Sequence, residues 1–291
     1  MKLFLLISLC CVTGSLAGIC QDAFKHSSDL SRPFFQVVEG QAIEIYYQKR
    51  ANQEMFGIKI YKNQDMRKKD LHCDLCVNAT QVEDGCFKIK STVLPVGPRD
   101  VLKYITMSKY TGKPEVKVAP TRTAEFTDYV IPSSCVCKSP PGPGYCGKAS
   151  DKITDYRPLF VFHEGATSAA YLPKAPSTAE VGLQALKNAN FVPAKQQKVP
   201  QKLDFNVEKL SERDGCYALD LNEPRFALGD HINFVVTGKK TDGKNIRTDP
   251  RKAYLNNYFI PSTCTCQQLP QQNLVKPTPA PAPAPAKLPK H

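Results

Sequence analysis

Short stretches of alternating apolar and polar residues, separated by glycine, proline and asparagine, run along most of the chain. In segment 55–61, aromatic and β-branched residues alternate with small or charged ones, which is the period of a β-strand with one buried face. Further segments with strand character are 42–47, 86–89, 101–107, 126–131, 216–221, 231–238 and 257–260. Short strands between turn residues predict an all-β fold of immunoglobulin-like antiparallel sandwiches.

The chain repeats one pattern at a long spacing. Arg32-Pro33-Phe34-Phe35 corresponds to Arg157-Pro158-Leu159-Phe160. The other matches are Glu39 with Glu164, Tyr46 with Tyr171, Lys62-Asn63 with Lys187-Asn188, Asp84-Gly85-Cys86 with Asp214-Gly215-Cys216, Asp100 with Asp230, and segment 129–137 with 258–266. A period of this length indicates two duplicated domains, here called copy one and copy two.

The repeat also decides between two interpretations of one segment. Ser177-Thr178-Ala179-Glu180, followed by apolar residues at 181, 183 and 186, has the form of a capping box that opens a helix. Its counterpart in copy one is the strand-like segment 55–61. Because two copies of one domain share a fold, we expect a strand in both.

Composition divides the chain into five parts. Residues 1–17 have the basic start, apolar stretch and small-residue end of a signal peptide. Two sandwiches, 18–137 and 153–266, flank a linker at 138–152 that is rich in proline and glycine. The Ala-Pro alternation within 267–291 predicts an extended, disordered spacer. No second long apolar segment follows, so we expect no transmembrane segment.

The formal charge of +12 favours acidic partners. The lysines are scattered, however, and the chain has no long basic block and no aromatic RNA-binding motif. We therefore interpret the charge as a generic basic surface and expect no nucleic-acid partner.

Export would place the cysteines in an oxidising compartment, where an even number indicates a disulfide framework. Asn78-Ala79-Thr80 is the one N-glycosylation sequon, so Asn78 is a candidate glycosylation site. These features together predict a secreted, extracellular glycoprotein. Once the signal is removed, ten cysteines remain: Cys20, Cys73, Cys76, Cys86, Cys135, Cys137, Cys146, Cys216, Cys264 and Cys266.

The cysteine count of each copy is odd, so each copy must send a bond outside itself. Either Cys20 and Cys146 accept those bonds, or the copies are bonded to each other. The shared positions suggest pairing of Cys86 with Cys135 or Cys137, and equivalently of Cys216 with Cys264 or Cys266. The alternative is a zinc site formed by Cys73, Cys76, Cys135 and Cys137.

Catalytic templates are absent from the sequence: it has no Gly-x-Ser-x-Gly, His-Glu-x-x-His, Gly-x-Gly-x-x-Gly or phosphate loop. The five histidines are scattered. We interpret the shared arginine (Arg32, Arg157) and glutamate (Glu39, Glu164) as surface ion pairs, and the shared tyrosine as a packing residue. The sequence therefore predicts no enzyme, no cofactor and no metal.

Segments 219–224, 227–234, 241–244 and 247–249 of copy two resemble the second half of a known module. It is the N-terminal carbohydrate-binding module of insect β-1,3-glucan recognition proteins, and the similarity spans roughly residues 156–260. The resemblance implies an immunoglobulin-like sandwich with polar glucan contacts at Arg247 and Asp249 and a hairpin at Asp242-Gly243. The tryptophan of that family falls near Val235, and this chain has no tryptophan.

These observations favour a secreted, non-enzymatic protein that binds polysaccharide, such as a microbial surface glycan, in innate immunity. Arg247, Asp249 and Asp242 are its candidate contacts. The alternative is a structural or interaction protein of an extracellular secretion or matrix, whose partner is another extracellular protein. A cystine-knot-like ligand ranks third.

Overall fold

The computed structural model describes residues 20, 24, 31–68, 71–138, 157–174, 177–192, 201–213 and 216–266. The predicted signal peptide at 1–17, most of the linker with Cys146, and the tail at 267–291 lie outside the described residues. No helix in the described part of the chain is long and apolar enough to cross a bilayer.

The described residues form β-strands throughout both copies, which confirms the all-β prediction. Segment 178–187 is a strand, as its counterpart in copy one indicated. Copy one contains β1 (Phe34–Val38), β2 (Ala42–Gln48), β3 (Gln53–Lys62), β4 (Leu75–Ala79), β5 (Val82–Glu83), β6 (Cys86–Ser91), β7 (Val101–Tyr110), β8 (Lys117–Val118), β9 (Arg122–Glu125), β10 (Tyr129–Ile131) and β11 (Cys135–Cys137). Copy two contains β12 (Leu159–His163), β13 (Ser168–Pro173), β14 (Thr178–Lys187), β15 (Phe205–Val207), β16 (Ser211–Arg213), β17 (Cys216–Leu221), β18 (His231–Lys240), β19 (Asn245–Arg247), β20 (Arg251–Tyr254), β21 (Tyr258–Ile260) and β22 (Cys264–Cys266).

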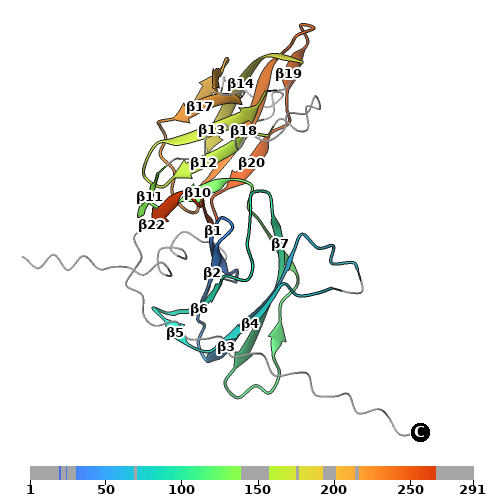
Figure 1. Ribbon diagram of the computed structural model, residues 1–291, viewed down its shortest axis with the longest axis vertical. Helices are drawn as coiled ribbons and strands as arrows, with labels where there is room; N and C mark the ends of the chain where they lie inside the picture. Colours follow the sequence, from blue (N-terminus) through green and yellow to red (C-terminus); the bar gives the residue numbers. More distant parts are fainter. Residues whose placement is uncertain are drawn as a thin grey trace, which may run out of the picture.

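Two sandwiches share one long sheet. That sheet has the order β16-β17-β13-β12-β10-β21-β1-β2-β6-β5. A five-stranded sheet, β4-β3-β7-β8 with β9 also on β7, packs on its copy-one half, where Tyr47 stacks on Phe56 at 4.2 Å between ring centroids. The sheet β15-β14-β18-β19, with β20 on β18, packs on the other half, where Phe160 meets Phe234 at 5.1 Å. The two lobes meet at β10, β1 and the neighbouring strands (Figure 1).

The two copies exchange their closing strands. β10 of copy one pairs in parallel with β12 of copy two, and β21 of copy two pairs in parallel with β1 of copy one. β10 and β21 also pair with each other, antiparallel, at Val130 and Phe259. Each sandwich is therefore completed by a strand from the other copy, and these two parallel pairings depart from the otherwise antiparallel arrangement that the sequence predicted.

Residues at equivalent positions of the two copies hold the exchanged strands. The backbone N–H of Phe160 donates to Asp128 at 3.1 Å, and that of Phe35 donates to Asn257 at 2.9 Å. Just before β10, the Asp128 carboxylate also binds Arg157 at 2.6 Å.

The shared glutamates both contact the closing segment of copy two. Glu164 accepts a hydrogen bond from the Tyr258 hydroxyl at 2.9 Å, and Glu39 accepts one from the backbone N–H of Ser262 at 3.4 Å. The predicted pairing of Arg157 with Glu164 is therefore wrong, because Arg157 binds Asp128, just before β10, and Glu164 binds Tyr258 of β21. The interpretation of the shared tyrosine as a packing residue agrees with Tyr46 and Tyr171, which are both buried.

The disulfides follow the strand exchange. Cys135 is bonded to Cys266 and Cys137 to Cys264, across the small β11–β22 sheet. The predicted bonds from Cys86 and Cys216 to these Cys-x-Cys segments are wrong, since the two segments pair with each other. Cys86 is bonded to Cys20, Cys73 is bonded to Cys76, and Cys216 is also disulfide-bonded. All four thiols of the zinc alternative are thus used in disulfides.

A repeated polar cluster explains further identities between the copies. Asp100 binds Lys62 at 2.8 Å and the Asn63 amide at 2.7 Å. In copy two, Asp230 binds Lys187 at 2.8 Å and Asn188 at 2.6 Å. Burial alone would raise the pKa of each aspartate, but these hydrogen bonds, together with one from a backbone N–H and the lysine charge, lower it. The cluster ties the end of β3 or β14 to the start of β7 or β18.

Candidate binding face

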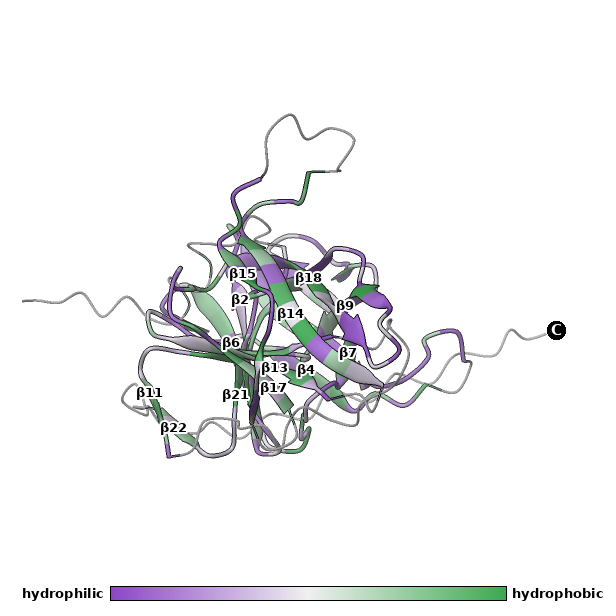
Figure 2. Ribbon diagram, turned by 90° about the horizontal axis from the view of Figure 1, so that it is seen from above, coloured by the Kyte–Doolittle hydropathy of each residue, from purple (hydrophilic) through white to green (hydrophobic). Residues whose placement is uncertain are grey.

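The outer face of the copy-two sheet β15-β14-β18-β19 carries the candidate site. Side chains alternate along a strand, so Leu183, Ala185 and Phe234 enter the core while Gln184 and Val235 point outward. Figure 2 shows this alternation of hydrophobic and hydrophilic residues along β14. The face crosses several strands.

A row of polar side chains, here called the polar strip, crosses three of these strands. Arg247 on β19 donates from Nη1 to Gln184 Oε1 on β14 at 3.2 Å. Gln184 in turn donates from Nε2 to Asn206 Oδ1 on β15 at 3.2 Å. Arg247 is exposed, and its guanidinium has donors left over after this one bond. The polar strip can therefore offer donors and acceptors to a ligand lying across the sheet.

Two side chains of β18 next to the polar strip are buried although they point to the outer side of the sheet. Val235, paired with Gln184, is 0% exposed, and Asn233 is 4% exposed. Asn233 Oδ1 has no hydrogen-bond partner in the described part of the chain. Because this oxygen is buried, it adds no acceptor for a ligand that lies on the face.

The three residues predicted as glycan contacts lie in different settings. Arg247 belongs to the polar strip. Asp249 is exposed and follows Thr248, whose hydroxyl accepts the backbone N–H of Val236 at 3.0 Å. Asp242 is at the tip of the β18–β19 hairpin, where its carboxylate binds Lys244 Nζ at 3.0 Å. The hydrogen bond from Lys244 lowers the pKa of Asp242. The Asp242 carboxylate therefore stabilises the hairpin turn in which it lies.

Gln184 and Asn206 were not predicted. The signal for Gln184 was its place as the one strongly polar residue in the apolar segment 181–186. Nothing in the sequence showed that Asn206 lies beside it, because that depends on the register of β14 with β15.

Copy one does not reproduce the polar strip. In copy two, Arg247 pairs with Thr237 on the next strand, and Thr237 pairs with Gly182. The residues at the equivalent positions of copy one are, in the same order, Val118, Met107 and Gly57. Val118 therefore stands in the place of Arg247. By the same register Lys59 replaces Gln184 and Ile105 replaces Val235.

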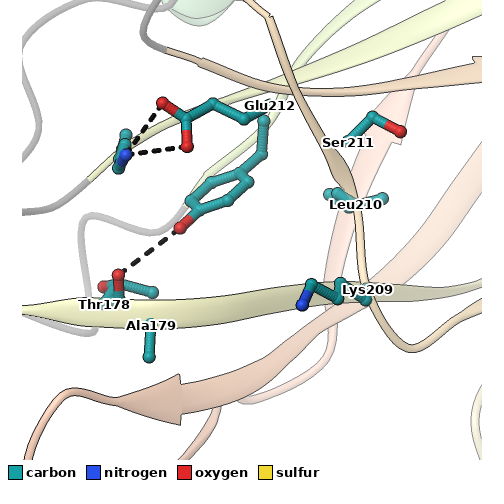
Figure 3. Close-up of a pocket in the computed structure, with 8 residues that line it drawn as sticks. Thr178, Ala179, Lys209, Leu210, Ser211 and Glu212 are labelled. Atoms are coloured by element: carbon teal, nitrogen blue, oxygen red, sulfur yellow. Dashed lines mark hydrogen bonds and ion pairs between the residues drawn. The ribbon is translucent and has the colours of Figure 1, made fainter.

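A hollow of about 540 Å³ lies at another place in copy two, between the two sheets (Figure 3). Its charged groups are already paired: Lys174 binds Glu212 at 2.7 Å and Lys209 binds Glu180 at 3.3 Å. The Tyr217 hydroxyl donates to the Thr178 carbonyl at 3.4 Å. The hollow is therefore a weaker candidate than the polar strip. It is lined by Lys174, Thr178, Ala179, Lys209, Leu210, Ser211, Glu212 and Tyr217.

Residues 26–135 match the family model of a carbohydrate binding domain (family 32). This match lies on copy one, whereas the resemblance noted from the sequence was drawn on copy two. No curated protein sequence matches the chain. Among solved structures, the FN1–FN3 domains of chicken CNTN1 align with 9% identity and a TM-score of 0.24. That alignment covers 77% of this chain and 63% of the other, so the chain spans less than two thirds of that structure.

Proposed function

We propose that the protein is a secreted, non-enzymatic binding protein that recognises polysaccharide, such as a β-glucan or another microbial surface glycan, in innate immunity. The polar strip of copy two carries this proposal. The match of copy one to a carbohydrate-binding family supports the class of ligand, because the two copies are duplicates of one domain.

The polar strip suits sugar hydroxyls, each of which can donate one hydrogen bond and accept others. Arg247 offers donors, Gln184 offers both kinds of group, and Asn206 offers its amide N–H groups. Charge-assisted hydrogen bonds are the stronger contacts, so Arg247 is expected to contribute most. The chain lacks tryptophan and has no aromatic platform at Val235, so we expect modest affinity at a single site.

Retention on insoluble glycans tests the class of ligand. Purified protein would be applied at low salt to curdlan, chitin, peptidoglycan and immobilised lipopolysaccharide. Retention on at least one of them, competed by the matching soluble glycan, is expected. Failure to bind all four would overturn the proposal.

The alternative function is a structural or interaction protein of an extracellular secretion. The observation that favours it is the double staple, Cys135–Cys266 and Cys137–Cys264, which fixes the two sandwiches to each other. Cross-linking in the native fluid separates the two functions. One abundant protein partner would favour the alternative, and release by soluble glycan would favour the first.

A further inference from the structure

The outer face of the copy-one sheet has a different character from that of copy two. Along β3 and β7 it presents Met55, Ile105 and Met107, all partly exposed, and β8 adds Val118 at 60% exposure. We call these four side chains the copy-one face. Contiguous apolar side chains on a surface are candidates for contact with another group.

Asn78 lies in the same row of this sheet. β4 pairs with β3 so that Asn78 is opposite Gly57, and Gly57 is opposite Met107, which is opposite Val118. A Cβ atom on Gly57 would collide with the amide oxygen of Asn78 and would come within 3.0 Å of the Met107 methyl group. The Asn78 amide therefore lies over the sheet, in space that the missing side chain of Gly57 leaves open.

Asn78 also begins the only N-glycosylation sequon of the chain, and its side chain is exposed on an edge strand. Two independent observations thus coincide at one residue: an acceptor sequence, and an amide set over an apolar face. A pyranose ring presents C–H groups on one side, which pack well against methionine and valine side chains.

We propose that Asn78 carries an N-linked glycan whose first sugars cross Gly57 and cover Met107 and Val118. In the linkage step the Asn78 amide nitrogen attacks the anomeric carbon of a lipid-linked oligosaccharyl diphosphate. A C–N bond forms, the C–O bond to the lipid diphosphate breaks, and the amide nitrogen loses one proton. The copy-one face is then covered by the chain's own carbohydrate.

Copy two has no counterpart. Gly182 is the counterpart of Gly57. A Cβ atom on Gly182 would meet the backbone carbonyls of Val207 and Glu208 instead of an asparagine amide, and no sequon is present there. The glycan therefore covers the copy-one face and leaves the copy-two face accessible to an external ligand. Only this last step rests on the proposed function.

Methionine oxidation tests the covering directly. The protein would be produced in a eukaryotic secretory host, and peptide mass spectrometry would measure occupancy of Asn78. Dilute peroxide would then be applied, and sulfoxide formation at Met107 would be compared with that at Met66. Met66 lies beyond the end of β3 and is the internal control.

We expect Asn78 to be occupied and Met107 to oxidise several-fold faster after enzymatic removal of the glycan, with Met66 unchanged. Thr80→Ala, which keeps Asn78 but destroys the sequon, should reproduce this change. An unmodified Asn78, or equal Met107 rates with and without the glycan, would overturn the proposal. Because no external polysaccharide enters the assay, its failure is distinct from failure of the proposed function.

Discussion

Cys135 of copy one is bonded to Cys266 of copy two, 131 residues further along the chain. Its neighbour Cys137 is bonded to Cys264 in the same antiparallel ladder. These two bonds use two cysteines of each copy, so the odd cysteine in copy one is Cys86, which is bonded to Cys20, and the odd cysteine in copy two is Cys216.

The two adjacent bonds should be strongly non-additive in stability. Replacing Cys135 and Cys266 by serine leaves the chain loop closed by Cys137–Cys264, so the free energy of unfolding should fall by less than about 1 kcal/mol. Removing both bonds opens a loop of more than a hundred residues and should cost about 5 kcal/mol by the chain-entropy model. Urea unfolding of the three proteins measures this, and two equal, additive losses would contradict the account.

The remaining cysteine pairing can be predicted by elimination. Four bonds join eight of the ten cysteines outside the predicted signal, and Cys216 is also bonded. Cys146 is the one cysteine left, so non-reducing peptide mapping should find it joined to Cys216. Cys146→Ser should then leave one free thiol, or give a disulfide-linked dimer, with both sandwiches folded. A free Cys146 in the wild-type protein would contradict this pairing.

Arg157 should contribute to stability through Asp128 rather than to binding. It joins the start of copy two to the segment before the exchanged strand β10 by a charge-assisted hydrogen bond. Arg157→Ala should lower the free energy of unfolding by about 2 kcal/mol. Arg67→Ala is the matched control, because Arg67 is exposed and its ion pair is with Asp65, two residues away. Thermal unfolding would compare the two variants. An equal loss of stability in both would contradict the stabilising role of Arg157.

Asp100 and Asp230 should make stability depend on pH. Their pKa values are lowered in the fold, so each stabilises it above the unfolded pKa of about 4. This contribution is lost as the pH falls through the lower pKa of the folded state. Asp100→Asn combined with Asp230→Asn should flatten the loss of stability below about pH 4. Glu54→Gln, at an exposed site on β3, is the control, and an unchanged pH profile in the double variant would contradict the assignment.

The strand pattern predicted most of the fold but not the exchange of strands. β10 reads Tyr-Val-Ile and β21 reads Tyr-Phe-Ile, so either segment has the apolar pattern to complete either sandwich. Segment 126–131 was predicted as one strand, yet β10 begins only at Tyr129, because Asp128 is engaged by Arg157 and Phe160. Partners 29 and 32 residues away decide that boundary, and a local pattern does not contain them.

The candidate site was likewise predicted only in part. A resemblance indicated Arg247, but the contacts of Arg247 with Gln184 and of Gln184 with Asn206 arise from the register of three strands. Asp242 was predicted as a glycan contact from the same resemblance, and in the structure its carboxylate caps a hairpin beside Lys244. A role for Asp249 stays a prediction.

The affinity of the Arg247→Ala variant for a soluble β-1,3-glucan tests the central claim most directly. Titration calorimetry would compare wild type, Arg247→Ala and Arg67→Ala, which remove the same charge from different copies. Loss of one charge-assisted hydrogen-bond donor should weaken binding about tenfold in Arg247→Ala, while Arg67→Ala binds as wild type does. Equal affinities for all three proteins, or equal losses in the two variants, would contradict the claim that the polar strip binds the glycan.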